Sequence, residues 1–174
     1  MEIFEKFEKI DAKELDNAIK AIGSDWMLIT LDDADNKKVN AMTASWGTLG
    51  VLWNKPICIC FVRPERHTFK LLSEKKELSI AFLPEDMREA YMVCGRESGK
   101  DIDKLKKCGL STVTLDGISV IGEAKTALTC RVLYEDDLKE CGFLDRSLLS
   151  NYATAGYHRV YICEIIGAYK NIKK

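Results

Sequence analysis

The chain has 174 residues, enough for one domain with a sizeable core, and its 47% hydrophobic and 30% charged content is ordinary for a globular protein. A formal net charge of -1 provides no field to hold nucleic acid or an anionic membrane, so an anionic ligand would need a local basic cluster. The first residues lack a basic segment followed by an apolar one, so we expect no secretory signal, and no apolar run approaches the roughly 20 residues of a membrane span. We therefore expect a cytoplasmic protein of a single domain over residues 1–174, without a nucleic-acid or membrane partner.

The hydrophobic pattern predicts many short strands separated by a few helices. Alternating or continuous apolar runs between turn residues indicate strands, and apolar residues three and four apart indicate helices. We expect strands at 26–31, 38–45, 57–63, 77–83, 118–121, 123–135 and 157–169, and helices at 11–22, 64–72, 84–94 and 103–107. Residues 47–51 would continue the second strand after a bend, 54–56 would form a loop, and 136–156 would form a long loop or an inserted helix. This order predicts a mostly β protein, a small antiparallel barrel with helical additions.

The seven cysteines do not form a recognisable metal or disulfide pattern. Their number is odd and no pair has C-x-x-C spacing, so we expect no metal site and reduced thiols in a reducing compartment. Cys58 and Cys60 alternate within an apolar run and should face the same side of a strand. Cys94, beside Gly95, is the best candidate for a redox role.

The stretch Asn40-Ala41-Met42-Thr43-Ala44-Ser45-Trp46-Gly47 is the most informative strand. Its hydroxyl side chains, Thr43 and Ser45, should share one face, with Met42, Ala44 and Trp46 on the other. Small hydroxyl residues leave room for a ligand close to the backbone, and Gly47 leaves room for a ligand or another backbone. The alternative is an ordinary barrel strand whose hydroxyl groups are satisfied locally.

A second candidate site lies where a strand passes into a helix at Arg63-Pro64-Glu65-Arg66-His67-Thr68. Proline is favoured at the first helical position, and the free N–H groups of a helix N-terminus suit a phosphate. Arg63, Arg66 and Thr68 could add charge and hydrogen bonds. A solvated helix start is the alternative.

A third candidate is the polar loop Ser98-Gly99-Lys100-Asp101. It fails as a nucleoside-triphosphate loop, because Cys94 occupies the position of the first glycine and Asp101 that of the Ser or Thr. What remains is a flexible loop with a lysine that could hold one phosphate. Neither histidine, His67 or His158, belongs to a recognised nucleophile motif. The three candidate segments thus offer groups that can hold a phosphate but no protein nucleophile, which predicts a protein whose cofactor does the chemistry.

These segments, in this order and spacing, resemble the flavin reductase-like, FMN-binding split-barrel family, particularly its flavoredoxin-like members. The resemblance extends through residues 127–132 and 158–165. It implies a six-stranded antiparallel Greek-key split barrel, a homodimer, and FMN bound near the dimer interface. Two departures concern the substrate side: Cys163 stands where a glycine is common, and residues 136–156 form a longer connection than in the simplest reductases.

The resemblance also implies a set of site residues. The isoalloxazine and ribityl chain would contact Thr43, Ala44, Ser45 and Trp46. The ribityl chain and phosphate would contact Val62, Arg63, His67 and Thr68. The segment that would close over the phosphate or the ring contributes Ser98, Gly99, Lys100 and Lys104. His158 matches a histidine that flavin reductases place near the nicotinamide side, and it is the one candidate catalytic residue.

The leading functional hypothesis is an FMN-dependent oxidoreductase that takes electrons from NADH, NADPH or a reduced partner and passes them to an acceptor. One alternative is a flavoredoxin-type electron carrier that uses no nicotinamide directly. Another is a flavin- or tetrapyrrole-binding module without turnover. Because no glycine-rich dinucleotide fingerprint is present, the electron donor stays open.

Overall fold

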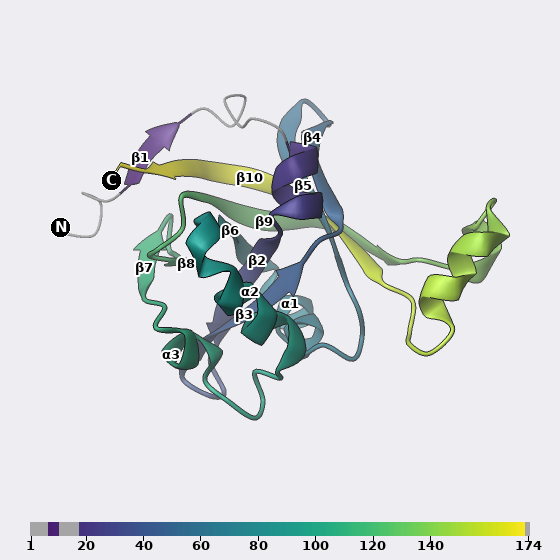
Figure 1. The fold of residues 1–174 in the computed structure, drawn as a ribbon. Coiled ribbons are helices and arrows are strands. Elements are labelled where there is room, and N and C mark those ends of the chain that lie inside the picture. Colours follow the sequence, from purple (N-terminus) through teal and green to yellow (C-terminus); the bar gives the residue numbers. More distant parts are fainter. Residues whose placement is uncertain (1–6, 11–17, 173–174) are drawn as a thin grey trace.

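A curled antiparallel sheet organises the chain (Figure 1). The computed structural model describes residues 7–10 and 18–172. Within them, an eight-stranded sheet has the order β3-β2-β6-β9-β10-β5-β4, with β1 paired to β10, and β7 and β8 form a separate hairpin. The strands are β1 (Phe7–Ile10), β2 (Met27–Asp33), β3 (Lys38–Ala44), β4 (Gly47–Leu52), β5 (Lys55–Val62), β6 (Glu77–Phe82), β7 (Thr112–Leu115), β8 (Ile118–Ile121), β9 (Thr126–Asp137) and β10 (Arg159–Asn171).

The two ends of the strand order are neighbours in the sequence. Only Ser45 and Trp46 separate the end of β3 from the start of β4, although no ladder joins these strands. The three Cα–Cα steps from Ala44 to Gly47 span at most about 11 Å, so the sheet has to curl until its ends come close together. The result is a barrel that stays open at Ser45–Trp46. The expected antiparallel split barrel is confirmed; its sheet has eight strands where six were expected.

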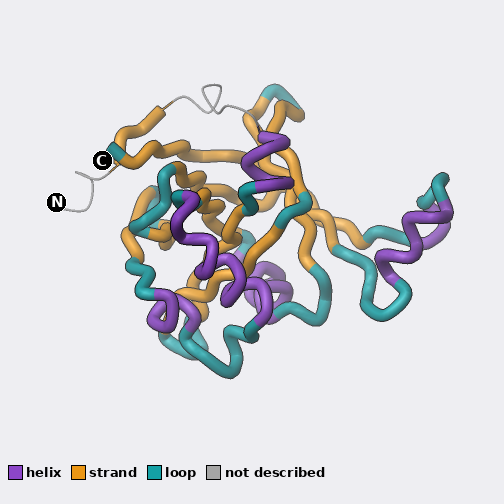
Figure 2. Tube along the Cα trace, in the orientation of Figure 1, coloured by secondary structure: helices purple, strands orange, loops and turns teal. Residues whose placement is uncertain are grey.

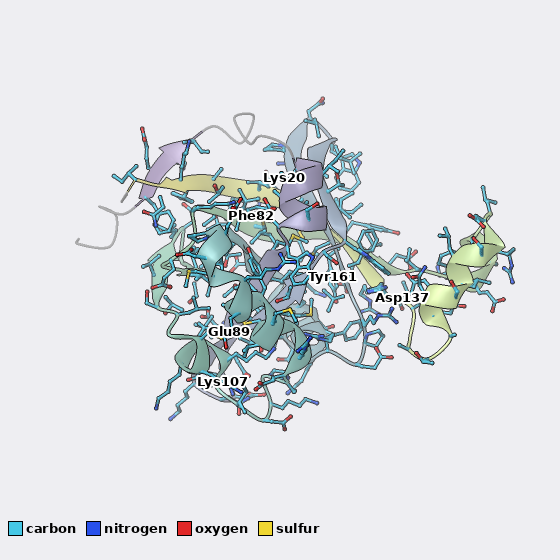
Figure 3. All side chains as sticks on the ribbon, viewed as in Figure 1. Lys20, Phe82, Glu89, Lys107, Asp137 and Tyr161 are labelled. Carbon is cyan, nitrogen blue, oxygen red and sulfur yellow. The ribbon has the colours of Figure 1, made fainter. Side chains whose placement is uncertain are left out.

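Alternation along the strands creates two cores. On β2, Met27 and Ile29 point into the barrel, while Leu28 packs in an outer layer. The outer layer lies between the sheet, the β7–β8 hairpin and two helices, α2 (Arg88–Arg96) and α3 (Lys104–Cys108), which lie together beside the strands in Figure 2. The side chain of Tyr161 is fully buried in the barrel (Figure 3).

All seven cysteines are free thiols. As expected from their spacing, Cys58 and Cys60 lie on the same side of β5, in the barrel core with Cys130 and Cys163. Cys94 is fully buried in the outer layer, and burial raises the pKa of its thiol to about 12. Since the thiolate is the reactive form, the structure gives no support to Cys94 as a candidate for a redox role, in line with the expectation of reduced, unreactive thiols.

Helix α1 (His67–Lys75) begins later than expected. Pro64 does not occupy its first position, because the N–H of Arg66 bonds to the carbonyl of Arg63 at 3.0 Å and closes a turn first. The expected stop of the short helix α3 at Gly109 is confirmed, with φ +65° at that residue. Of the expected helix 11–22, residues 11–17 lie outside the described residues, and Lys20–Ser24 form a π-helical turn. A 3₁₀ turn at Glu85–Met87 precedes α2.

The hairpin β4–β5 corrects two expectations. Residues 47–51 do not continue β3; they form a strand of their own that pairs with β5. The expected loop at 54–56 is also wrong, because Lys55 and Pro56 already pair with Leu52 and Val51. Trp53 and Asn54 make the turn alone, with φ values of 52° and 58°. Strand β7 was not expected from the sequence.

Residues 138–158 form a connection that projects from the body between β9 and β10 (Figure 1). Asp137, labelled in Figure 3, lies where it departs. The connection contains two 3₁₀ segments, Glu140–Gly142 and Arg146–Tyr152, so the predicted long loop or inserted helix is a long loop with short helical turns. No helix in the described ranges, 7–10 and 18–172, is both long and apolar enough to cross a bilayer.

Gly47 illustrates how closely the strands approach at the opening. A Cβ atom there would lie 2.6 Å from the carbonyl oxygen of Ile59 and 3.0 Å from Met27 Cε. The sequence left open whether a ligand or another backbone needs this space; in the structure the backbone of β5 occupies it.

We expect Gly47→Ala to lower the free energy of unfolding by about 1–3 kcal/mol in denaturant titrations, since overpacking forces a backbone shift. Gly50→Ala on the same strand meets no atom within 4 Å and is the control.

Candidate functional site

Two neighbouring cavities open beside the split in the barrel. The first, here called the ring cavity, has a volume of about 210 Å³, and the second, the anion cavity, about 190 Å³. Arg66 lines both. The other lining residues of the ring cavity are Met42, Thr43, Ala44, Ser45, Trp46, Phe61, Arg63 and His158. Those of the anion cavity are Glu65, His67, Thr68, Arg96, Glu97, Ser98, Gly99 and Lys104.

The ring cavity is built on the end of β3. Met42 and Ala44 are buried as the alternation predicted, but Trp46 is 45% exposed, because the strand ends at Ala44. The hydroxyl group of Thr43 donates to the carbonyl oxygen of Tyr91 at 2.6 Å. Thr43 is therefore satisfied locally, as the alternative reading held, and can only accept a hydrogen bond from a ligand.

His158 closes the other side of the ring cavity. Its ring lies 5.1 Å from that of Trp46 and 6.4 Å from that of Phe61, measured between centroids. Burial and, to a smaller extent, the positive charge of Arg63 lower the pKa of His158 to about 4, with Glu65 opposing the shift. At neutral pH the imidazole is therefore uncharged.

Of the basic residues that line the anion cavity, Lys104 and Arg66 are shielded from water, and neither pairs with a carboxylate among the described residues. Lys104 is 4% exposed and donates to the carbonyl oxygens of Ala41 and Cys94, at 2.8 and 3.1 Å. Arg66 donates to the carbonyl oxygens of Gly95 and Cys94. Burial lowers the pKa of both side chains, that of Lys104 to about 8, because removing a charged group from water disfavours its charged form. An anion bound between them would offset this desolvation penalty.

The N-terminus of α1 adds to the same cavity. No side chain caps it, and His67 and Thr68 of its first turn line the cavity. The unpaired N–H groups and the helix dipole favour an anion there. The two acidic residues of the lining are engaged elsewhere: Glu65 accepts from the N–H of Gly156, and Glu97 pairs with Lys107.

The loop after α2 closes over the cavity through Gly99. A Cβ atom on Gly99 would lie 2.0 Å from Oδ1 of Asn40, a buried side chain that donates to the hydroxyl of Thr68. Only glycine lets the loop descend this far. Lys100, the next residue, points to solvent and lines neither cavity.

His67 is held by a buried carboxylate. Its Nε2 lies 2.7 Å from Oδ2 of Asp33, whose side chain is fully buried, and Asn36 donates to the same carboxylate. Burial opposes the charge of Asp33, but the hydrogen bonds from His67 and Asn36 outweigh it, so the pKa of Asp33 is lowered. This pair fixes the orientation of the imidazole at the cavity.

A lowered pKa makes the Asp33 pair sensitive to acid. The carboxylate stabilises the folded state fully above its unfolded pKa of 3.8, and this contribution is lost as the pH falls through the lower folded value. We expect Asp33→Asn to lower the free energy of unfolding by about 1–3 kcal/mol at pH 7 and to flatten its decline in acid. Denaturant titrations from pH 7 to pH 2 test this. Asp35→Asn, which removes an exposed carboxylate of the same hairpin, should leave the decline unchanged.

The structure brings together eleven of the thirteen predicted site residues. Thr43, Ala44, Ser45, Trp46, Arg63 and His158 line the ring cavity, and His67, Thr68, Ser98, Gly99 and Lys104 line the anion cavity. Arg63 thus lies on the ring side, although it was expected to reach a phosphate. Two residues line neither cavity: Val62 is fully buried in the barrel core, and Lys100 is exposed.

Several lining residues were missing from the predicted set. Phe61 could have been found from the strand period, because it shares the face of Arg63 while Val62 faces the core. Arg66 was a candidate for phosphate, but its position between both cavities depends on the contact with α2. Arg96 and Glu97 give no sequence signal. Within the described ranges, no group of three or more His, Cys, Asp or Glu residues could hold a metal ion.

The site can therefore bind a long ligand with a planar end and an anionic end. Each cavity is smaller than the ~300 Å³ of a typical ligand pocket, so such a ligand would occupy both. The lining offers no nucleophile paired with a base, and its one histidine on the ring side is uncharged. This arrangement holds and orients a cofactor rather than attacking a substrate itself.

A family model described as "Flavin reductase like domain" matches residues 20–173, nearly the whole chain. No curated protein matches it. Among solved structures, the FMN-binding domain of a flavin reductase-like enzyme from Shewanella baltica is similar with a TM-score of 0.69 and 16% identity, covering 96% of this chain and 78% of that chain.

Two further solved structures have the same fold. Flavoredoxin from Methanosarcina acetivorans has a TM-score of 0.67 and 21% identity, covering 84% of this chain and 68% of its own. The NADH:FAD oxidoreductase SgcE6 from Streptomyces globisporus has a TM-score of 0.63 and 16% identity, covering 83% and 73%. At these identities the likeness establishes the fold.

Proposed function

The chain belongs to the flavin reductase-like family, and we propose that it is an FMN-dependent oxidoreductase. It would pass electrons from NADH, NADPH or a reduced partner through the flavin to an acceptor. One observation carries this proposal: the buried Lys104 and the half-buried Arg66, neither paired with a carboxylate among the described residues, lie in the anion cavity, and Arg66 also lines the neighbouring ring cavity with its aromatic residues. FMN has a phosphate at one end and a planar ring at the other.

The residues of this chain fit FMN in both cavities. Arg66, Lys104 and the N-terminus of α1 would hold the phosphate. Trp46, Phe61 and His158 would border the ring, which they shield from water, and Thr43 could accept a hydrogen bond from a ring N–H. The bound flavin would supply the redox chemistry.

A homodimer is the assembly that we propose. Strand β4 is an edge strand, and Val51 and Trp53 on its hairpin are 75% and 56% exposed. Unpaired edges with exposed apolar side chains invite pairing with another chain. A second copy here would also cover the open side of the ring cavity beside Trp46.

The seven free thiols support a reducing compartment, for which we propose the cytoplasm.

An absorbance spectrum of the purified protein, followed by NADH or NADPH without oxygen, tests the function. A flavin band that either nucleotide bleaches would support a reductase and identify its donor. A band that persists with both nucleotides but bleaches with a reduced ferredoxin would favour a flavoredoxin-type carrier. A band that neither donor bleaches would favour a non-catalytic binding module. No flavin band after incubation with FMN would overturn the proposal.

A further inference from the structure

The end of the projecting connection folds back onto the ring cavity. Arg63 donates to the carbonyl oxygens of Asn151 and Gly156, at 2.9 and 3.3 Å. Glu65 accepts from the N–H of Gly156 at 2.5 Å. These bonds tie the connection to the segment between β5 and α1, so the residues between them have a fixed place at the cavity.

Tyr152 lies within this tied segment and contacts His158. Its hydroxyl group is 3.1 Å from Nδ1 of His158, and the two rings are nearly perpendicular, at 83°. No other hydrogen bond to either imidazole nitrogen of His158 is found among residues 7–10 and 18–172. The nitrogen that remains for a ligand in the ring cavity is therefore Nε2.

The charges around the pair decide which partner donates. Burial and the charge of Arg63 lower the pKa of His158, with Glu65 opposing, so the imidazole carries one proton at neutral pH. Burial raises the pKa of Tyr152, so its hydroxyl group stays protonated. The guanidinium of Arg63 also lies 5.2 Å from the centre of the Tyr152 ring. A nearby cation makes a phenol a better donor and a poorer acceptor, so Tyr152 donates and Nδ1 accepts.

We propose that Tyr152 is a positioning residue that fixes His158 in the Nε2–H tautomer, and that the ring cavity therefore selects planar ligands with a carbonyl oxygen at this edge. A neutral imidazole whose Nδ1 accepts must carry its proton on Nε2. That N–H can donate to an acceptor oxygen and cannot accept from a donor. The ligand class rests on the proposed function; the tautomer does not, because it is a property of the protein without flavin.

Nitrogen-15 NMR of the flavin-free protein tests the tautomer. The chain has only two histidines, so His158→Gln assigns the signals. At pH 7 we expect a protonated Nε2 and an unprotonated Nδ1 for His158. A protonated Nδ1 in the parent protein would overturn the proposal without any variant.

Tyr152→Phe then tests the role of the hydroxyl group. We expect a mixture of both tautomers and a rise in the pKa of His158, because a hydrogen bond donated to Nδ1 stabilises the neutral form. Tyr157→Phe is the matched control, since Tyr157 stacks on Tyr152 at 4.9 Å without a hydrogen bond to His158. An unchanged tautomer in Tyr152→Phe would assign the fixing to the surrounding rings and overturn the proposal. If that variant does not fold, a correlation between the Tyr152 hydroxyl proton and Nδ1 in the parent protein decides the same point.

A pair of small probes tests the ligand class. Acetophenone and ethylbenzene have similar shapes, but only acetophenone carries a carbonyl oxygen. We expect acetophenone to shift the Nε2 signal of the parent protein at least several-fold more than ethylbenzene does. Equal shifts would reject the carbonyl preference while leaving the FMN spectrum, and with it the proposed function, unaffected.

Discussion

Replacing Arg66 by alanine should weaken FMN binding by well over tenfold and leave riboflavin binding nearly unchanged. A hydrogen bond to a charged group is worth roughly 1.5–3 kcal/mol, and about 1.4 kcal/mol is a factor of ten in affinity. Arg66 is held at the anion cavity by the carbonyl oxygens of Cys94 and Gly95, so its guanidinium is oriented before a phosphate arrives. Riboflavin has the same ring and no phosphate. Fluorescence titrations with both flavins measure the difference.

The control for Arg66→Ala is Lys100→Ala. Lys100 directly follows Gly99 in the loop over the anion cavity, but its side chain is exposed and lines neither cavity. We expect its removal to change FMN affinity by less than about threefold, as for other screened surface charges. Equal losses of FMN and riboflavin affinity in Arg66→Ala would move the phosphate out of the anion cavity. The thermal midpoints of both variants should be compared, because Arg66 also contacts α2.

Gly99→Ala should weaken FMN binding about as strongly, with only a small change in thermal stability. The added Cβ would lie 2.0 Å from Oδ1 of Asn40 and 3.4 Å from a carbon of His67. Asn40 cannot swing away, because it is 2% exposed and bonded to Thr68. The loop must therefore rise from the anion cavity. Isothermal titration with FMN and a thermal melt measure the two effects.

A second substitution makes this prediction specific. Asn40→Ala removes the two atoms closest to the new Cβ, Oδ1 and Cγ of Asn40, so Gly99→Ala combined with Asn40→Ala should bind FMN better than Gly99→Ala alone. Gly95→Ala, one residue past Cys94, meets only Thr43 at an ordinary 3.5 Å and should be tolerated. If the double variant binds no better than the single one, the closure of the loop does not depend on the contact with Asn40.

The strand and helix pattern was largely readable from the sequence because burial imposes a period. The alternation on β3 correctly separated Met42 and Ala44 from Thr43, and it failed at Trp46 because the strand ends before that residue. Hairpin register was harder to predict. Pro56 and Lys55 resemble a loop, yet they pair with β4, since Pro56 lies near the end of the hairpin.

The sequence could not show which of two similar cations reaches the site. Lys100 and Lys104 look alike in the sequence, as solvated lysines near a glycine. Their difference arises only when α3 packs against β3 and α2, which buries Lys104 among carbonyl oxygens and leaves Lys100 in water. The different positions of Arg63 and Arg66 also depend on tertiary contacts. Arg63 is hydrogen-bonded to the projecting connection at the ring cavity, and Arg66 is hydrogen-bonded to α2 between the two cavities.

The sequence by itself determined the mostly β, antiparallel fold class, the three segments of the site and their kinship with flavin reductase-like proteins. These features depend on local periodicity and on residue types at fixed spacings, which a linear chain records. Only the tertiary structure decided which cations lose their water, which hydroxyl groups are already satisfied, and that Tyr152 meets His158. Each of these depends on contacts between distant segments, and desolvation and hydrogen bonding take their energies from those contacts.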